Sequence, residues 1–435
     1  MDVKHGWVEK FHGDELIVPI PQLGAVRAAL TESGVGLADV EENRTLGLAR
    51  LSGLTGIEAA ASRLLEDPAI RHELTAYRDE RNAAHPRAPE VSDLAVLIEG
   101  VRLLLDRRYP GWQITIGKNY RPSLIRGYPH TEPWGDGEPT PTSENFTKPI
   151  EPAPGPGAGR GVKVGVLDTR LFPHPTLVGH LDPRADLLRA YKGQLTEFDG
   201  HCTFVASCIL QQAPAAKLYP RRVLDRNGDG SAWEAAVAIA NLVPLGLDVV
   251  NLSFGEYMTD DDSAPMVLAA AIGRLSRDTV VVAAAGNNGD VDRARARVKG
   301  PDANTANAAN DVPPGITPHT TSYPAALPDV VGVGAVDAKD DRAPFTPKDA
   351  PWITLLARGV NLNAAYLDGK VQVPSQAALV PFTGTANWAG CSFAAGAVSG
   401  VIAARTAPGQ RTARQALDEL VASLQQQARP GLLIN

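Results

Sequence analysis

The sequence has little of what marks membrane, nucleic-acid-binding or disulfide-rich proteins. Its longest apolar runs, such as VVNLSF and VVVAAAG, are far too short to cross a bilayer. Its 42 Lys and Arg residues are outnumbered by 49 Asp and Glu residues, the net charge is −7, and no basic cluster is interleaved with aromatic residues. We therefore expect neither nucleic acid nor a membrane as a partner.

Cysteines are also scarce. The three that are present have no metal-like spacing, which suits a reducing compartment. We expect neither a metal site nor a cofactor. The first ten residues, MDVKHGWVEK, contain no apolar segment typical of a secretory signal. We therefore expect a cytoplasmic protein.

The length of 435 residues and the 44% of apolar residues predict a folded protein of two or three domains. Residues 1–127 predict a small α+β domain, residues 128–160 are rich in proline and glycine and predict an extended linker, and residues 161–435 predict a second, larger domain. In the first domain we expect strands at 14–20 and 112–117, two strands within 35–53, and helices at 23–33, 57–67 and 92–108, the last capped by Ser92.

The larger domain alternates continuous apolar runs with helical stretches rich in small residues. Continuous apolar runs are typical of strands that are buried on both faces of a parallel sheet. The pattern therefore predicts an α/β fold with helices on both faces of the sheet. The expected strands are 162–168, 217–224, 248–255, 279–287, 329–337 and 352–359, and the expected helices are 202–212, 231–243, 264–276 and 392–406.

Four polar residues follow strands or begin helices in this domain, in the order Asp168, His201, Asn287, Ser392. Each one alone is better explained as a turn, cap or packing residue. Together they provide the groups that acyl transfer needs: a nucleophile, a base, a carboxylate that orients the base, and an amide that donates to the oxyanion.

Several segments resemble the subtilisin-like serine peptidases, the subtilases. They include VGVLDTRLFPHPTL around Asp168, GHCTFVASCI around His201, VVVAAAGNNG around Asn287 and GCSFAAGAVSGVIAA around Ser392, in family order over about residues 160–407. The resemblance implies a subtilisin-like three-layer α/β fold with a mostly parallel central sheet, preceded here by the small α+β domain. It also implies that Asp168, His201 and Ser392 form the catalytic triad, and that Asn287 and the backbone amide of Ser392 form the oxyanion hole.

The resemblance further implies how a substrate is held. Gly228, Asp229 and Gly230 match the edge segment that pairs with substrate backbone, and Ser253, Phe254 and Gly255 match the strand on the other side. The substrate is then an extended polypeptide added as a strand between them. For the N-terminal domain two roles stay open: an intramolecular inhibitor, like the propeptides of the family, or a permanent substrate-recognition module.

The sequence departs from the family pattern at several positions. Arg170 and Gly396 replace a usual glycine and proline, and Cys202 and Cys391 stand beside His201 and Ser392. We interpret the two cysteines as small packing residues, with an oxidation-sensitive switch as the alternative.

Three further features concern the surroundings of the predicted site. After the histidine helix there is almost no room for the loop that binds a calcium ion in many family members, so we expect that site to be absent. Residues 290–322 form a long insertion near the expected specificity pocket. Acidic residues near the substrate strands are either solvated or favour a basic residue before the cut bond. These acidic residues are Asp229, Glu256 and Asp260 to Asp262.

The sequence as a whole predicts a cytoplasmic serine endopeptidase that acts on polypeptides through an acyl-enzyme intermediate. A catalytically silent peptide-binding protein is one alternative, although it would have no need of all four catalytic residues. An esterase with the same triad is the other, although two substrate-flanking strands suit a peptide better than a small ester.

Overall fold

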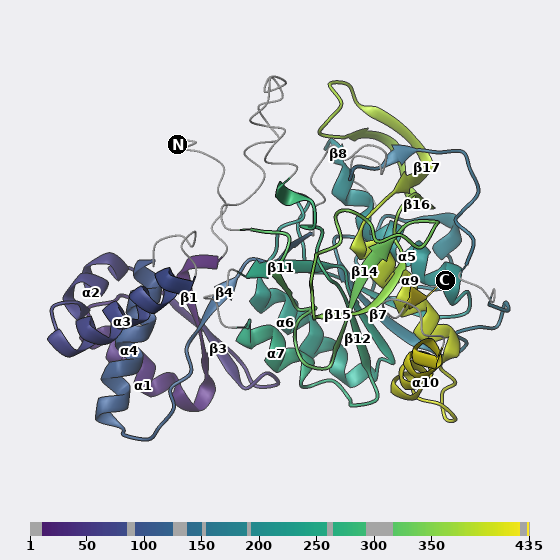
Figure 1. The fold of residues 1–435 in the computed structure, drawn as a ribbon. Helices are drawn as coiled ribbons and strands as arrows, with labels where there is room; N and C mark the ends of the chain where they lie inside the picture. Colours follow the sequence, from purple (N-terminus) through teal and green to yellow (C-terminus); the bar gives the residue numbers. More distant parts are fainter. Residues whose placement is uncertain are drawn as a thin grey trace.

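The computed structural model describes residues 11–84, 92–124, 137–149, 154–188, 193–258, 264–292, 316–426 and 433–434. These residues form a small N-terminal domain that packs against a larger domain (Figure 1). None of the helices in these ranges is both long enough and apolar enough to cross a membrane.

The N-terminal domain is a four-stranded antiparallel sheet with the strand order β2-β3-β1-β4 and helices on one face. The elements are β1 Phe11–Pro19, α1 Leu23–Glu32, β2 Asp39–Asn43, β3 Leu48–Ser52, α2 Ile57–Leu64, α3 Pro68–Ala84, α4 Asp93–Arg108 and β4 Gly117–Tyr120. Successive side chains of β1 point to opposite faces of the sheet, so each face packs against a different apolar cluster. Leu16 and Val18 belong to the domain's own core, whereas Ile17 belongs to the apolar cluster of the larger domain.

Most of the elements expected here are present, with two corrections. Ser92 caps α4 as predicted, its Oγ accepting a hydrogen bond from the backbone of Ala95 at 3.3 Å. The strand expected at 112–117 was misplaced, because β4 begins only at Gly117. Helix α3 was not predicted. Its sequence is strongly polar, and Ile70 and Leu74 are the buried residues among its described side chains.

The larger domain is built on a seven-stranded parallel sheet, which confirms the predicted fold class. Its strands, in spatial order, are β18 Leu433–Ile434, β15 Ile353–Arg358, β14 Val330–Val336, β12 Val280–Ala284, β10 Val249–Leu252, β7 Lys163–Asp168 and β9 Lys217–Arg222. The helices that cover it are α5 His201–Gln212, α6 Ala232–Leu242, α7 Met266–Ile272, α9 Cys391–Arg405 and α10 Ala413–Gln426.

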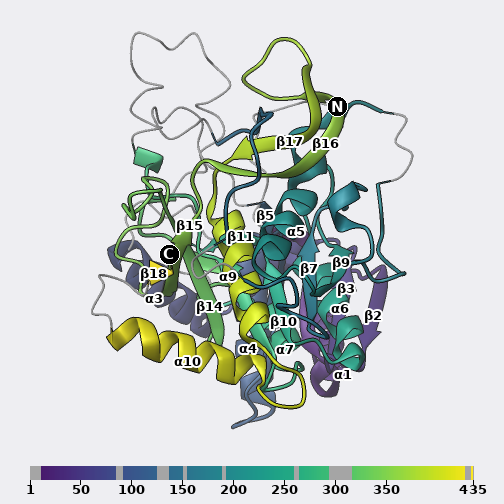
Figure 2. The same cartoon turned by 90° about the vertical axis from the view of Figure 1, so that its right-hand side faces the viewer.

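Helices lie on both faces of this sheet, so the domain has three layers (Figure 2). Val249 of β10 and Val282 of β12 belong to the apolar cluster that includes α5, α9 and α10, whereas Val250 and Val281 belong to the cluster that includes α6 and α7. Adjacent strand residues thus serve opposite faces, which is why these strands have no polar side.

Two smaller sheets flank the main one. The expected strand 248–255 is in fact two strands, because after β10 the chain leaves the main sheet and continues as β11, Phe254–Met258. Strand β11 pairs with β13, Thr321–Tyr323, and with β5, Ser123–Leu124.

The second sheet comprises β6 Thr140–Pro141, β8 Leu195–Thr196, β16 Leu362–Gln372 and β17 Val380–Trp388. Strand β6 belongs to the stretch expected as a linker and pairs with β17. Four short 3-10 helices complete the described elements: Ile20–Gln22, Pro175–Leu177, Glu197–Gly200 and Val243–Leu245.

Candidate active site

Asp168 and His201 meet at the carboxyl ends of the parallel strands. Asp168 is the last residue of β7 and is fully buried, and His201 is the first residue of α5. The Nδ1 atom of His201 lies 2.8 Å and 3.0 Å from the two carboxylate oxygens of Asp168. The carboxylate therefore holds the ring proton on Nδ1 and leaves Nε2 as the basic nitrogen.

The turn before His201 is held rigidly. The 3-10 helix Glu197–Gly200 begins with a reciprocal pair of hydrogen bonds between Thr196 and Asp199. The Asp199 carboxylate is buried and also binds the guanidinium of Arg226, with Nε 3.0 Å from Oδ1. This pair ties the histidine turn to the chain that leads into Gly228.

Ser392 is the second residue of α9 and is almost completely buried. Its Oγ donates to the backbone oxygen of Ser253 at 3.2 Å. Phe393, which follows it, packs against the imidazole of His201, with ring centroids 5.2 Å apart. The fold thus places the serine and the histidine on adjoining helices.

Helices α5 and α9 approach closely because α9 carries glycines where they cross. A Cβ atom on Gly400 would lie 2.5 Å from the backbone oxygen of Ile209, and one on Gly396 would lie 3.2 Å from that of Val205. The departure from the family pattern at Gly396 therefore has a packing role. Close crossing of these two helices sets the separation between their first residues.

A chain of buried hydrogen bonds supports the turn that carries Ser392. The Oγ of Ser399 donates to Oδ1 of Asn251 at 3.0 Å, the Nδ2 of Asn251 donates to Oγ of Ser253 at 2.8 Å, and that hydroxyl donates to the backbone oxygen of Ser392 at 2.9 Å. Sequence reasoning missed Asn251 and Ser399. A polar Asn within the apolar run VVNLSF was the available signal.

Asn287 lies beside the nucleophile, three residues beyond β12. Its Oδ1 accepts a hydrogen bond from the backbone amide of Cys391 at 3.1 Å, and its own backbone amide donates to the hydroxyl of Tyr257 at 2.7 Å. Because Oδ1 is bound to Cys391, the NH2 group of the same amide points the other way. This orientation suits a donor to an oxyanion formed at Ser392.

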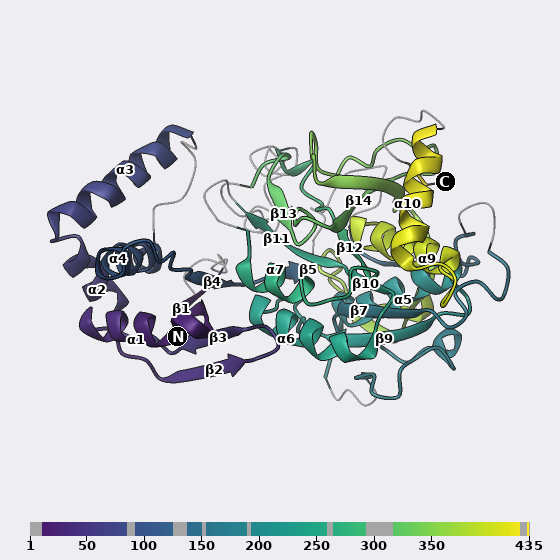
Figure 3. The same cartoon turned by 90° about the horizontal axis from the view of Figure 1, so that it is seen from below.

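The residues predicted to bind substrate flank a segment of the protein's own chain. Strand β5 of this segment lies beside β11 (Figure 3). The backbone amide of Leu124 donates to the oxygen of Gly228 at 2.7 Å, and that of Gly230 donates to the oxygen of Pro122 at 2.8 Å. On the other side, Leu124 pairs antiparallel with Phe254. The remaining pairs are Ser123 with Asp229 on the first side and Ser123 with Gly255 on the second. Residues 122–124 therefore lie as a strand between the two predicted segments, and Ser253 lies next along the chain, against Ser392.

The two cysteines beside the catalytic residues are fully buried. Burial raises the pKa of the Cys391 thiol to about 12, although Thr346 opposes the shift with a contact of 3.6 Å to Sγ. Burial also raises the pKa of Cys202 well above its usual value, and the Asp168 carboxylate adds to the effect. Both side chains are therefore neutral thiols, which favours the packing interpretation.

Part of the predicted surroundings lies outside the described residues, namely Asp260 to Asp262 and residues 293–315 of the insertion. The described ends of the insertion lie at the oxyanion segment. The Nδ2 of Asn288 donates to the backbone oxygens of Thr317 and Thr320 at 2.6 Å and 3.2 Å. Within the described ranges, no group of three or more His, Cys, Asp or Glu side chains has the arrangement of a metal site.

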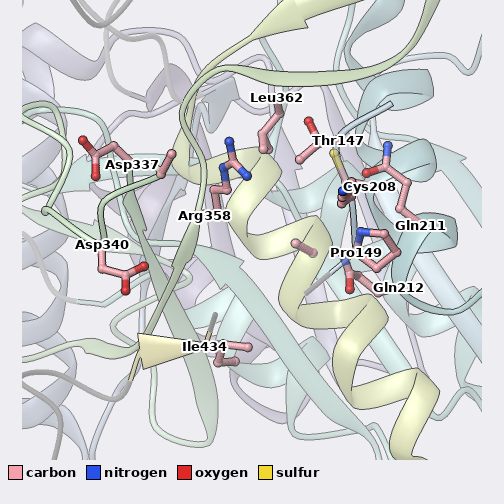
Figure 4. Close-up of a pocket in the computed structure, with 13 residues that line it drawn as sticks. Thr147, Pro149, Cys208, Gln211, Gln212, Asp337, Asp340, Arg358, Leu362 and Ile434 are labelled. Atoms are coloured by element: carbon pink, nitrogen blue, oxygen red, sulfur yellow. The ribbon is translucent and has the colours of Figure 1, made fainter. Parts of the chain in front are cut away.

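A separate cavity of about 380 Å³ lies between α5, α9 and the ends of β14 and β15 (Figure 4). Cys208, Gln211 and Arg358 are among its lining residues. None of the ten predicted site residues lines this cavity, so it is distinct from the groove at Ser392.

Comparisons with known proteins agree with this geometry. Residues 159–429 match the model of the Subtilase family. The chain is 30% identical over 218 residues to "Thermostable alkaline protease" of Halalkalibacterium halodurans, which covers 48% of this chain and 50% of that protein. It is also 30% identical over 217 residues to "Subtilisin Savinase" of Lederbergia lenta, covering 48% of this chain and 67% of that protein. The chain thus spans only half of the first relative.

A solved structure is similar over the whole chain. Fervidolysin from Fervidobacterium pennivorans, described as a keratinolytic enzyme related to subtilisin, superposes with a TM-score of 0.59 and 16% identity, covering 100% of this chain and 61% of that one. At this identity the likeness concerns the fold alone, and it includes the N-terminal domain.

Proposed function

Because this chain belongs to the subtilase family, we propose that it is a serine endopeptidase that cleaves polypeptides bound in extended form beside Ser392. One observation carries the proposal. Residues 122–124 already lie as a strand between Gly228–Gly230 and Phe254–Gly255, which is the geometry that a peptide substrate needs.

We assign the groups the following roles, and the contact between His201 and Asp168 supports the part played by that pair. Nε2 of His201 takes the proton of the Ser392 hydroxyl as its oxygen attacks the peptide carbonyl, and Asp168 stabilises the imidazolium that forms. The Asn287 amide and the backbone amide of Ser392 donate to the oxyanion. Collapse of the tetrahedral intermediate breaks the C–N bond, and His201 returns the proton to the leaving amine. Water then releases the acyl group by the same steps.

The position of residues 122–124 favours a peptidase over an esterase, because paired strands on both sides recognise a backbone that a small ester lacks. It also supports the inhibitory role for the N-terminal domain. The segment that fills the groove continues directly from β4, and Asn119 of β4 binds the first turn of α6. We propose that the domain blocks the groove of its own chain until it is cleaved or displaced.

A fluorophosphonate probe tests the chemistry. The parent protein should gain one adduct by intact mass, slowly while residues 122–124 fill the groove and rapidly once the N-terminal domain has been released by limited proteolysis. The Ser392→Ala variant should gain none in either state, because the probe reacts only with an activated hydroxyl. The Ser143→Ala variant, altered at an exposed serine, should react like the parent protein. Cleavage of the parent chain beyond Leu124, with the Ser392→Ala chain intact, would additionally show self-processing.

A failure to label Ser392 would support the alternative hypothesis of a catalytically silent peptide-binding protein. If the parent chain takes up no probe at Ser392 even after the N-terminal domain has been released by limited proteolysis, the serine is not activated and the endopeptidase proposal is wrong.

A further inference from the structure

The side chain of Leu124 is 2% exposed, and it fills a subsite built by the turn that carries Gly228. From it we infer that this protein selects polypeptides with a leucine-like aliphatic residue at the second position before the cut bond, and that Gly228 determines this specificity. The inference rests on the proposed peptidase function, and it names the substrate class of that groove.

The register fixes which substrate position Leu124 represents. Leu124 lies opposite Phe254, and Ser123 lies opposite Gly255 in the antiparallel pair. A bound chain that continues in this register places its next residue opposite Ser253, whose backbone oxygen is 3.2 Å from Oγ of Ser392. The residue opposite Ser253 therefore precedes the cut bond directly, and Leu124 occupies the position before it.

Gly228 makes the space for this side chain. Its φ of 80° lies in the left-handed region, which favours glycine. A Cβ atom at this position would lie 3.0 Å from Cδ1 of Leu124 and 3.1 Å from its Cβ and Cγ. The leucine thus packs directly over the glycine backbone, and Leu124 shares one buried apolar cluster with Leu224 and Phe254.

The subsite is preformed, and the carboxylates of Asp225 and Asp199 beside it already have hydrogen-bond partners. Oδ1 of Asp225 accepts hydrogen bonds from the backbone amides of Asn227 and Asp229 at 2.8 Å and 3.0 Å, which fixes the turn around Gly228. The carboxylate of Asp199 is bound by Arg226 from the same turn. A charged side chain in place of Leu124 would be buried against the apolar side chains of Leu224 and Phe254, which is unfavourable.

The first test measures binding without catalysis. In the full-length Ser392→Ala chain, a second change, Leu124→Asp, should expel the internal strand and open the groove. We then compare a capped peptide with the sequence of residues 119–127, NYRPSLIRG, with the same peptide carrying Asp in place of Leu. The leucine peptide should bind at least about 10-fold more tightly, since a buried methylene alone discriminates about 10- to 200-fold.

A matched control places the same charge one residue earlier. Ser123→Asp, combined with Ser392→Ala, alters a half-buried side chain of the same strand and should leave the groove closed to the peptide. In the Leu124→Asp, Ser392→Ala background, Gly228→Ala should lower the affinity for the leucine peptide about 10-fold. It should lower the affinity for a peptide with Gly at the same position much less. Equal affinity for the leucine and aspartate peptides, or binding of neither, would overturn the inference.

Catalysis is measured separately so that the two proposals can fail independently. The Leu124→Asp chain with native Ser392 should react with the fluorophosphonate probe faster than the parent chain, because its groove is open. Probe uptake together with equal peptide affinities would refute the leucine subsite alone. Selective peptide binding without probe uptake would keep the subsite and refute the peptidase.

Discussion

At the scale of single residues, the thiols beside the catalytic groups decide whether oxidation controls the site. A thiol reacts with alkylating agents and peroxide as the thiolate. With a pKa of about 12, only about 10⁻⁴ of Cys391 is ionised at pH 8. Cys202 and Cys208 have raised pKa values for the same reason, which is burial.

We therefore predict that iodoacetamide at pH 8 modifies none of the three cysteines in the native protein and all three in 6 M guanidinium, as read by intact mass. Stoichiometric peroxide should leave the rate of probe labelling at Ser392 unchanged. Rapid alkylation of Cys202 or Cys391 in the native chain, together with a loss of probe labelling at Ser392, would instead support the hypothesis of an oxidation-sensitive switch.

The residues of the candidate active site were predictable because the chemistry of acyl transfer allows few residue types in each role. Asp168, His201, Asn287 and Ser392 stand in motifs, and the structure brings Asp168 against His201 and Asn287 against the amide beside Ser392. The bond between Ser399 and Asn251 was not predictable, because 148 positions separate them and neither belongs to a motif with that pairing. Such contacts depend on how α9 packs on the sheet.

At the scale of elements, strand β4 and helix α6 join the two domains through one buried amide. Asn119 is fully buried, its Oδ1 accepts from the backbone amide of Trp233 at 3.0 Å, and its Nδ2 donates to Oγ of Ser231 at 3.1 Å. It thereby adds an acceptor to the unsatisfied amides at the start of α6, where Ser231 is the N-cap residue.

We predict that Asn119→Ala destabilises this junction by about 1–3 kcal/mol, the usual cost of leaving a buried partner unsatisfied. The measurement is the urea unfolding free energy of the full-length chain with Ser392→Ala, which prevents self-cleavage. In the chain with native Ser392, the same change should accelerate probe labelling, because β5 follows β4 directly. Gln194→Ala, at an exposed amide away from the junction, serves as the control and should do neither.

If Asn119→Ala lowers stability without changing the labelling rate, β5 stays in the groove independently of β4. The N-terminal domain would then not control access in the proposed way.

The sequence predicted where helices and strands lie better than it predicted which strands pair with each other. The run 248–255 was expected to be one strand, yet it supplies β10 to the main sheet and the start of β11 to the groove. Both halves are apolar and buried, so no change of pattern marks the point where the chain changes sheets. Strand β5 is only two residues long, too short for any pattern, and its pairing depends on the docking of the whole domain.

At the scale of the whole molecule, the β1 residue His12 lies in a cluster of charges that reaches the larger domain through Arg50. Burial lowers the pKa of the His12 imidazole, the positive charges of Arg121 and Arg50 act in the same direction, and Glu15 and Asp14 oppose the shift. The Nε2 atom of His12 is buried and has no hydrogen-bond partner among the described residues. The guanidinium of Arg50 also lies 5.9 Å from the ring centroid of the α6 residue Trp233.

These contacts predict that acid weakens the assembled chain. Because the pKa of His12 is lower in the folded protein than in the unfolded chain, the unfolded chain binds more protons once the pH falls to about 6.5. The stabilising contribution is therefore complete above that pH and is lost as the pH falls toward the lowered pKa of the folded state. The unfolding free energy of the Ser392→Ala chain should be smaller at pH 5.5 than at pH 7.5, and His12→Gln should reduce the difference. His72→Gln, at an exposed histidine of α3, should not. An unchanged pH dependence in the His12→Gln chain would assign the acid sensitivity to other groups, and the junction would then be insensitive to this histidine.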